Sequence, residues 1–193
     1  MPTPAQLKKI WLLSDTVLYP EAVAFMHKHV QESEALPTSQ MTGLFNAAAS
    51  EQYPALYQFV THQRDRNWPN SKMHIKKFYT ALEETLTRLH RTRLRNEFHL
   101  LEDAPGRSVS ETRQEMDVLM ALLAREFIQH VLAENGVQLQ AEEERRRQRA
   151  RGSDGGRPQG RQGQQERQRQ QGQQRPRTGE GNRQQGQQQN NRR

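Results

Sequence analysis

Apolar residues recur every three or four positions along the first 140 residues, which is the spacing of one face of an α-helix. Turn and cap residues divide this pattern into six segments. They span 5–13, Pro20 to about Glu34, Thr38 to Ser50, Pro54 to Arg66, Ser71 to about Glu102, and Ser108 to Asn135. No stretch alternates apolar and polar residues as a half-buried strand does. The sequence therefore predicts an all-α protein, a compact bundle of about five to six helices.

The boundaries of these segments follow from local chemistry. Pro20 and Pro54 suit the first turn of a helix, where the missing N–H needs no partner. The segment 108–111 has the capping-box pattern, and Asn135-Gly136 is a typical helix end. Gly43 interrupts an apolar helix face at a cost of about 1 kcal/mol relative to Ala. We therefore expect another helix to approach closely at this glycine.

Each segment has an apolar face that we expect to lie in the core. The longest face belongs to the segment that starts at Ser71, whose opposite side carries Lys, Arg and Glu. Trp11 and Phe45 belong to the apolar positions of the first and third segments. The predicted inward positions of the two longest segments are Met73, Ile75, Phe78, Tyr79, Leu82, Leu86 and Leu89, and then Met116, Leu119, Met120, Leu123, Phe127, Val131 and Leu132.

The composition changes near residue 140. Residues 145–193 contain 14 Arg, 15 Gln, 9 Gly and 3 acidic residues, with no Lys and no large apolar side chain. Such a segment cannot bury enough apolar surface to offset the entropy lost on ordering. We therefore predict a helical bundle domain over 1–140, followed by a disordered, basic, Arg/Gln/Gly-rich tail over 141–193.

The net charge of +7 is unevenly distributed along the chain. The 14 Arg and 3 acidic residues of 145–193 give +11, whereas 15 basic and 19 acidic residues give −4 over 1–144. A basic arm of this kind favours a polyanionic partner, most simply nucleic acid. The alternative is a solubilising segment with no specific partner.

Signatures of enzymes and metal sites are absent from the sequence. It has no cysteine, its seven histidines show no HExxH or matched i, i+4 pair, and it has no nucleotide-binding or hydrolase fingerprint. The apolar run after Lys9 is too short for a signal peptide, and no run reaches the roughly 20 residues of a membrane span. We expect a soluble, cytoplasmic, non-catalytic protein with no cofactor and no membrane partner.

A basic segment next to the second tryptophan is the sharpest candidate for nucleic-acid binding. The guanidinium groups of Arg64 and Arg66 can bind phosphate, and the indole of Trp68 can stack on an unpaired base. In the alternative interpretation, Trp68 is a core residue and the two arginines pair with Asp65 or Glu51. The predicted RNA-contacting residues are Arg64, Arg66, Trp68, Lys72, Lys76, Lys77, Arg88, Arg91 and Arg95 in the helical domain, and Arg145, Arg146 and Arg147 in the tail.

The stretch LPTSQMTGLFNAA, followed by a helix, a basic segment and a long amphipathic helix, resembles the small helical subunit of type III CRISPR effector complexes. The shared motif is Thr38-Ser39-Gln40 at a helix start, and the resemblance covers about residues 20–100. Met41 stands where that family has a basic residue. The resemblance implies a non-catalytic subunit that assembles with other effector subunits and with copies of itself along a filament. It also implies sequence-independent contact with the backbone of the target RNA or the guide–target duplex, because base pairing carries the sequence information.

Two functions therefore follow from the sequence. The first is an RNA-binding small subunit of a CRISPR-type ribonucleoprotein effector, with the basic tail as an additional arm. The second is a helical adaptor whose mildly acidic domain binds protein, and whose tail alone binds nucleic acid nonspecifically. RNA binding by the helical domain without its tail distinguishes the two.

Overall fold

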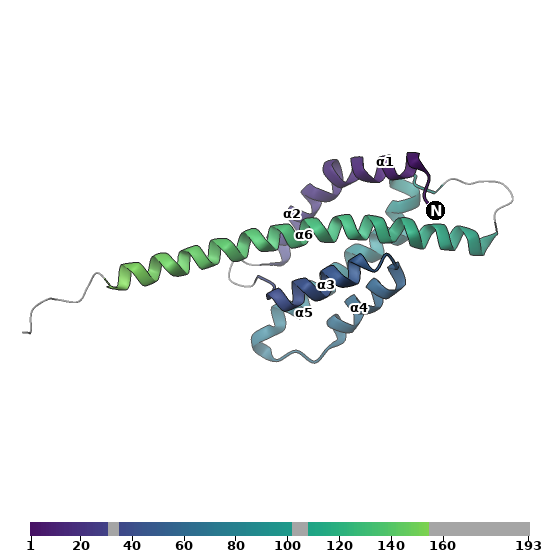
Figure 1. The fold of residues 1–193 in the computed structure, drawn as a ribbon. Coiled ribbons are helices and arrows are strands. Elements are labelled where there is room, and N and C mark those ends of the chain that lie inside the picture. Colours follow the sequence, from purple (N-terminus) through teal and green to yellow (C-terminus); the bar gives the residue numbers. More distant parts are fainter. Residues whose placement is uncertain (31–34, 102–107, 155–193) are drawn as a thin grey trace, which may run out of the picture. The chain divides into compact units, whose positions relative to one another are not determined.

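The computed structural model describes residues 1–30, 35–101 and 108–154 (Figure 1). The elements in chain order are α1 (Pro4–Leu13), the π-helix η1 (Ser14–Leu18), α2 (Tyr19–His29), α3 (Thr38–Ala49), α4 (Tyr53–Asp65), the 3₁₀ turn η2 (Asn70–Lys72), α5 (Met73–Arg88), the π-helix η3 (Leu89–Glu97) and α6 (Val109–Asp154). Within the described ranges there is no strand, and the predicted all-α fold is confirmed. The bundle comprises Met1–Arg149, and a second unit begins at Ala150. Residues 155–193 of the predicted tail lie outside the described part of the chain.

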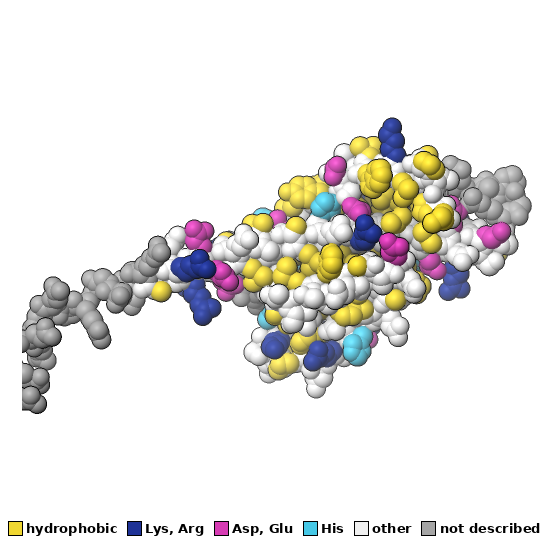
Figure 2. Space-filling model, in the orientation of Figure 1, with side chains coloured by type: hydrophobic (Ala, Val, Ile, Leu, Met, Phe, Trp, Pro, Cys, Tyr) yellow, Lys and Arg dark blue, Asp and Glu magenta, His cyan; other side chains and the backbone are white. Residues whose placement is uncertain are grey.

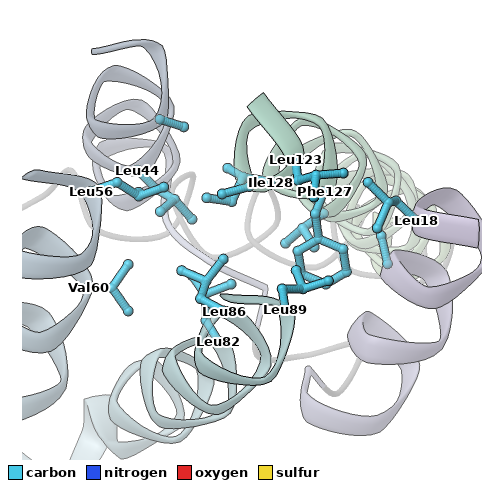
Figure 3. Close-up of a cluster of buried hydrophobic side chains, with 14 of the residues drawn as sticks. Leu18, Leu44, Leu56, Val60, Leu82, Leu86, Leu89, Leu123, Phe127 and Ile128 are labelled. Atoms are coloured by element: carbon cyan, nitrogen blue, oxygen red, sulfur yellow. The ribbon is translucent and has the colours of Figure 1, made fainter. Parts of the chain in front are cut away.

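Helix α5 supplies the middle of the hydrophobic core. Figure 3 shows side chains from η1, α3, α4, α5, η3 and α6 converging in one cluster. Phe25 of α2 packs edge-to-face against both Phe78 of α5 and Phe127 of α6, at centroid separations of 5.5 and 5.8 Å. Most predicted inward positions of the two longest segments are thereby enclosed: Ile75, Phe78, Tyr79, Leu82, Leu86, Leu89, Leu119, Met120, Leu123, Phe127, Val131 and Leu132.

Three of the apolar positions lie outside the core. The exposed fractions are 63% for Trp11, 48% for Phe45 and 38% for Met73. Trp11 and Phe45 each follow a buried residue, Ile10 and Leu44 respectively. Because each helical residue is rotated by about 100° from the one before, a helix that buries only a narrow stripe turns the residue after a buried position toward solvent. The bundle therefore leaves apolar side chains on the surfaces of α1 and α3.

The two N-terminal helices are continuous, whereas the sequence predicts separate ones. η1 joins α1 to α2, and the N–H of Tyr19 donates to the carbonyl of Ser14, five residues earlier. In a regular α-helix, the ring of Pro20 would clash with a carbonyl of the preceding turn. The wider π-helical turn lets the chain pass Pro20 without ending the helix. It also directs the Ser14 hydroxyl to Glu126 and His130 of α6, at 3.0 and 2.8 Å.

The prediction that the last helix ends at Asn135-Gly136 is wrong, because α6 continues to Asp154. Asn135 is fully buried, and its side-chain amide forms hydrogen bonds with both the N–H and the C=O of Leu36. Its Oδ1 accepts from the N–H of Leu36 at 2.7 Å, and its Nδ2 donates to the C=O at 3.1 Å. The side chain therefore satisfies the backbone that leads into α3 instead of ending α6.

Beyond Gly136 the helix is supported by its own side chains. Three glutamates at 142–144 precede three arginines at 145–147, and Glu143 and Arg147 form an i, i+4 pair at 3.7 Å. Such pairs, with Glu on the N-terminal side, contribute about 0.2–0.5 kcal/mol each, and Glu, Gln, Arg and Ala favour helices. The predicted tail over 141–193 therefore starts inside α6, and its first arginines are helical.

Gly43 permits a close approach between α3 and α4, as the sequence predicts. A Cβ at this position would lie 3.3 Å from Cζ of Phe59. Phe59 packs edge-to-face on Tyr79 of α5, with ring centroids 6.2 Å apart. The hydroxyl of Tyr79 donates to Oε1 of Gln40 in the first turn of α3, at 3.2 Å. Gly43 thus lies against an aromatic pair that links three helices.

We expect neighbouring substitutions at positions 135 and 136 to change stability in opposite directions. Gly136→Ala adds a methyl group where nothing lies within 4 Å. The gain in helix propensity should raise the free energy of unfolding by about 0.5–1 kcal/mol. Asn135→Ala leaves the buried N–H and C=O of Leu36 without partners, and should lower it by about 2–4 kcal/mol. Urea denaturation measures both, and a destabilised Gly136→Ala variant would contradict a helix that passes through this residue.

Candidate nucleic-acid interface

Five of the predicted cationic residues meet where α4 ends and α5 begins. We call this group the α4–α5 corner, and it comprises Arg64, Arg66, Lys72, Lys76 and Lys77. Figure 2 shows Lys and Arg side chains over this connection, at the lower end of the view. Cations near the end of α4 are favoured by its helix dipole, whereas the start of α5 is itself the positive end of a helix. The end of α4 therefore favours the cations, and the start of α5 adds to their positive potential.

Trp68 anchors the connection between α4 and α5. Its side chain is 8% exposed, and its Nε1–H donates to the carbonyl of Gln63 at 2.8 Å. The guanidinium of Arg66 lies 4.7 Å from the centre of the indole ring, in a cation–π contact. Of the two interpretations that the sequence allows, the structure shows Trp68 as a core residue. With so little exposed area the ring cannot stack on a base in this conformation, so its role at the corner is to hold the backbone and Arg66.

Arg64 is largely neutralised by its neighbours. Its guanidinium donates two hydrogen bonds to the carboxylate of Asp65, both at 2.8 Å, and lies 3.3 Å from Glu83 of α5. The hydrogen bonds from Arg64 lower the pKa of Asp65, and the charge of Lys76 lowers it further. The predicted pairing of Arg64 with Asp65 is confirmed, and the ion pair with Glu83 ties the end of α4 to α5.

The other four cations of the corner have no such compensation. Arg66, Lys72 and Lys77 are exposed, and Lys76 is half-buried. None of these four forms an ion pair with any residue in the described ranges. A cationic side chain left without an acid and facing water is available to a phosphate. The corner therefore offers three exposed cations, Arg66, Lys72 and Lys77. Arg64 is paired, and the half-buried Lys76 lies close enough to Asp65 to act on its charge.

A second predicted group lies at the opposite end of α5. Arg88, Arg91 and Arg95 occupy the last turn of α5 and the π-helix η3, and all three are exposed. Between Lys76 and Arg88 the helix rises by about 18 Å, at about 1.5 Å per residue. These arginines are therefore separate from the α4–α5 corner and do not extend its surface.

The third predicted group, Arg145–Arg147, projects from the same end of the bundle as the corner. At that end, Asn135 of α6 binds Leu36, and Tyr79 of α5 binds Gln40. From Asn135 the helix α6 continues for about 15 Å to reach the three arginines. Their side chains are exposed, and Arg147 pairs with Glu143. Figure 1 shows α6 extending past the ends of α3 and α5.

The sequence pattern does not single out Arg93, which is the basic residue most deeply placed in the bundle. Its side chain on η3 is 7% exposed. It donates to Glu21 of α2 at 2.6 and 2.9 Å and to Glu97 at 2.7 and 2.8 Å, and it lies 4.6 Å from the centre of the Phe98 ring. The only sequence signal for this cluster is the i, i+4 spacing of Arg93 and Glu97, which is typical of an ion pair on a helix. The other partner, Glu21, is 72 residues away, so the role of Arg93 as a tie between α2 and η3 is tertiary.

We expect Arg93→Ala to lower the free energy of unfolding by about 2–3 kcal/mol, because it leaves two carboxylates without their common partner. Arg95→Ala is the matched control: Arg95 is exposed on the same π-helix, and its loss should change stability by less than about 0.5 kcal/mol. Urea denaturation at neutral pH measures the difference. Equal effects of the two substitutions would contradict a structural role for Arg93.

The Arg93→Ala variant also tests how the stability of the fold depends on pH. The hydrogen bonds from Arg93 lower the pKa of Glu97 from its ordinary value of 4.5. A carboxylate with a lowered pKa stabilises the fold above pH 4.5, and this contribution is lost as the pH falls through the folded-state pKa. The stability difference between the wild-type chain and Arg93→Ala should therefore shrink in acid, as thermal melts at neutral pH and at about pH 3 would show.

Comparison with known proteins provides no family for this chain. No family model matches the sequence, and no curated protein or solved structure matches it. In the described ranges no three His, Asp or Glu side chains are grouped to hold a metal ion, and no helix has the length and apolar character needed to cross a bilayer. The surface of the bundle itself is therefore the basis for a functional assignment.

Proposed function

We propose that this chain is a non-catalytic, RNA-binding small subunit of a multi-subunit CRISPR-type ribonucleoprotein effector. The observation that carries the proposal is the α4–α5 corner, where three exposed cations, Arg66, Lys72 and Lys77, form no ion pair with any residue in the described part of the chain. The helical fold agrees with the resemblance of residues 20–100 to the small subunit of type III effectors. The corner would contact the backbone of the target RNA.

The chemistry of the corner suits a phosphate backbone better than base edges. Lys72 and Lys77 are flexible point charges, whereas Arg66 offers a planar fork that its contact with Trp68 holds in place. Phosphate contacts position a nucleic acid without reading its sequence. This is the type of contact that a subunit needs when a guide RNA already provides the sequence specificity.

An exposed apolar surface supports the assembly part of the proposal. Trp11 and Leu12 on α1 are each 63% exposed, Tyr19 is 52% exposed, and Val118 of α6 is 36% exposed. Figure 2 shows hydrophobic side chains gathered over α1 and between α1 and α6. Large exposed apolar surfaces rimmed by polar residues mark protein–protein contacts. This surface would bind another effector subunit or a second copy of the chain.

The first test of the proposal is RNA binding by a chain that ends at Arg149. This chain retains the whole compact unit, including Arg145–Arg147, and lacks residues 150–193 of the Arg/Gln/Gly-rich tail. Replacing Arg66, Lys72 and Lys77 together by Glu should weaken its binding to single-stranded RNA by at least about tenfold. It should also reduce the slope of log Kd against log salt by about 2, because each phosphate contact releases about 0.7 counterion. Fluorescence anisotropy across a salt series measures both quantities.

The matched control replaces three exposed lysines elsewhere, Lys8, Lys9 and Lys28, by Glu, which causes the same change in net charge. Equal losses in the two triple variants would mean that only net charge matters, and would contradict a specific interface at the corner. If the chain that ends at Arg149 does not bind RNA while the full chain does, the adaptor alternative is correct, with the tail alone binding nucleic acid.

The second test concerns assembly. We expect sedimentation velocity of the full chain to show self-association that rises with concentration, and Trp11→Glu with Leu12→Glu to abolish it. Both side chains are mostly exposed, so the melting temperature of this variant should stay close to that of the wild type. Phe45→Glu on α3 is the control, because Phe45 is also exposed but lies on a different helix. A wild-type chain that stays monomeric at every concentration would contradict self-association.

A further inference from the structure

A recess of about 330 Å³ lies between the start of α4, the π-helix η3 and the first half of α6. We call it the Tyr53 pocket, and its chemistry comes from Tyr53, Tyr57, His90, Arg91, Arg113 and Asp117. Arg91 is 15 residues after Lys76 along α5 and η3, a rise of about 22 Å, so the cationic rim of the pocket is separate from the exposed cations of the α4–α5 corner. The wall residue Tyr57 is closer to the corner, because it donates to Glu83, which also pairs with Arg64. The volume of the pocket is at the lower end of the range of about 300–1,000 Å³ for small-molecule sites.

One wall of the pocket is aromatic and held in place. The rings of Tyr53 and His90 are stacked, with centroids 4.9 Å apart and an angle of 22° between their planes, and Tyr57 lies 5.9 Å from Tyr53. The hydroxyl of Tyr57 donates to Glu83 at 2.5 Å, and that of Tyr53 donates to the carbonyl of Leu86 at 3.4 Å. Tyr53 is itself only 6% exposed, so it supports the wall from behind, and the half-buried rings of Tyr57 and His90 are the ones that can stack on a planar ligand.

The rim of the pocket carries more positive than negative charge. Arg91 and Arg113 are both exposed, and neither forms an ion pair within the ranges that the structure describes. Asp117 is half-buried and lies close enough to act on the charge of both His90 and Tyr53. A ligand that suits this rim has a negative group for the two guanidinium groups, and a donor for the carboxylate.

His90 adds a polar atom without a partner. Its Nε2 is buried, and no hydrogen-bond partner for it exists in the described part of the chain. Burial is also the main reason why the pKa of His90 is below its ordinary value, so the ring is neutral at physiological pH. The neutral imidazole of His90 lines the pocket, and its Nε2 lacks a hydrogen bond within the described residues. Buried polar atoms of this kind, and π-helical turns, are both common at binding sites.

We propose that the Tyr53 pocket binds a single nucleotide, with its base against the aromatic wall and its phosphate between Arg91 and Arg113. The carboxylate of Asp117 accepts a hydrogen bond from the base or the ribose. The half-buried rings can stack on the base, and each of the two planar guanidinium groups can donate two charge-assisted hydrogen bonds to the oxygens of the phosphate. The nucleotide is either free or an unpaired nucleotide of an RNA strand.

The test uses adenosine 5′-monophosphate, adenosine and inorganic phosphate as probes, with the full chain at physiological salt. Saturation-transfer NMR and calorimetry should show saturable binding of the monophosphate that is tighter than binding of either part alone. Arg113→Gln should weaken it by at least about tenfold, the effect of losing a charge-assisted contact. Lys28→Gln, which removes an exposed cation that does not line the pocket, should leave binding of the monophosphate unchanged.

Two further arms decide the source of the nucleotide. If Arg113→Gln also weakens binding of single-stranded RNA, the ligand is an unpaired nucleotide of that RNA. If only the monophosphate is affected, the ligand is free. The Glu variant of Arg66, Lys72 and Lys77 should still bind the monophosphate, so failure of the corner and failure of the pocket are separable. No saturable binding, or equal weakening by Lys28→Gln and Arg113→Gln, would overturn the proposal.

Discussion

Burial of the apolar side of α5 is the constraint on which the other helices depend. Its side chains fill the centre of the core, and Phe25 links Phe78 of α5 to Phe127 of α6 through two edge-to-face contacts. Each such contact contributes about 0.5–1.5 kcal/mol beyond the area that it buries. Because one side of α5 is enclosed in this way, its Lys and Arg residues emerge only at its ends and along its remaining side. The same apolar stripe therefore determines the positions of both cation groups.

Two buried polar side chains then fix helices that are distant in sequence. Asn135 binds both backbone groups of Leu36, and Arg93 joins Glu21 to Glu97. Apolar packing alone tolerates small shifts of one helix along another, whereas these hydrogen bonds have defined partners and directions. Asn135 holds the segment before α3 against α6, and Arg93 holds α2 against η3, the π-helix that also carries His90 and Arg91 of the Tyr53 pocket.

The two candidate sites have different characters. The α4–α5 corner is an open, cationic surface, suited to contacts with phosphate that do not depend on sequence. The Tyr53 pocket is a small recess in which stacked rings and two arginines recognise the shape of one ligand. The apolar surface around Trp11 is a third feature. The charged residues Lys8 and Lys9 precede it in the sequence.

The sequence by itself determined the all-α class, most helix positions, the inward faces of α5 and α6, and the close approach at Gly43, because helical spacing and local steric needs are properties of neighbouring residues. It also placed basic residues at the ends of α4 and α5. Only the tertiary structure decided that Trp68 is buried, that Arg64 is paired across to Glu83, and that α6 continues through Gly136. Each of these outcomes depends on partners from another part of the chain. Local signals cannot contain that information, since a tryptophan, an arginine or an Asn-Gly pair has the same intrinsic preferences whichever helix packs against it.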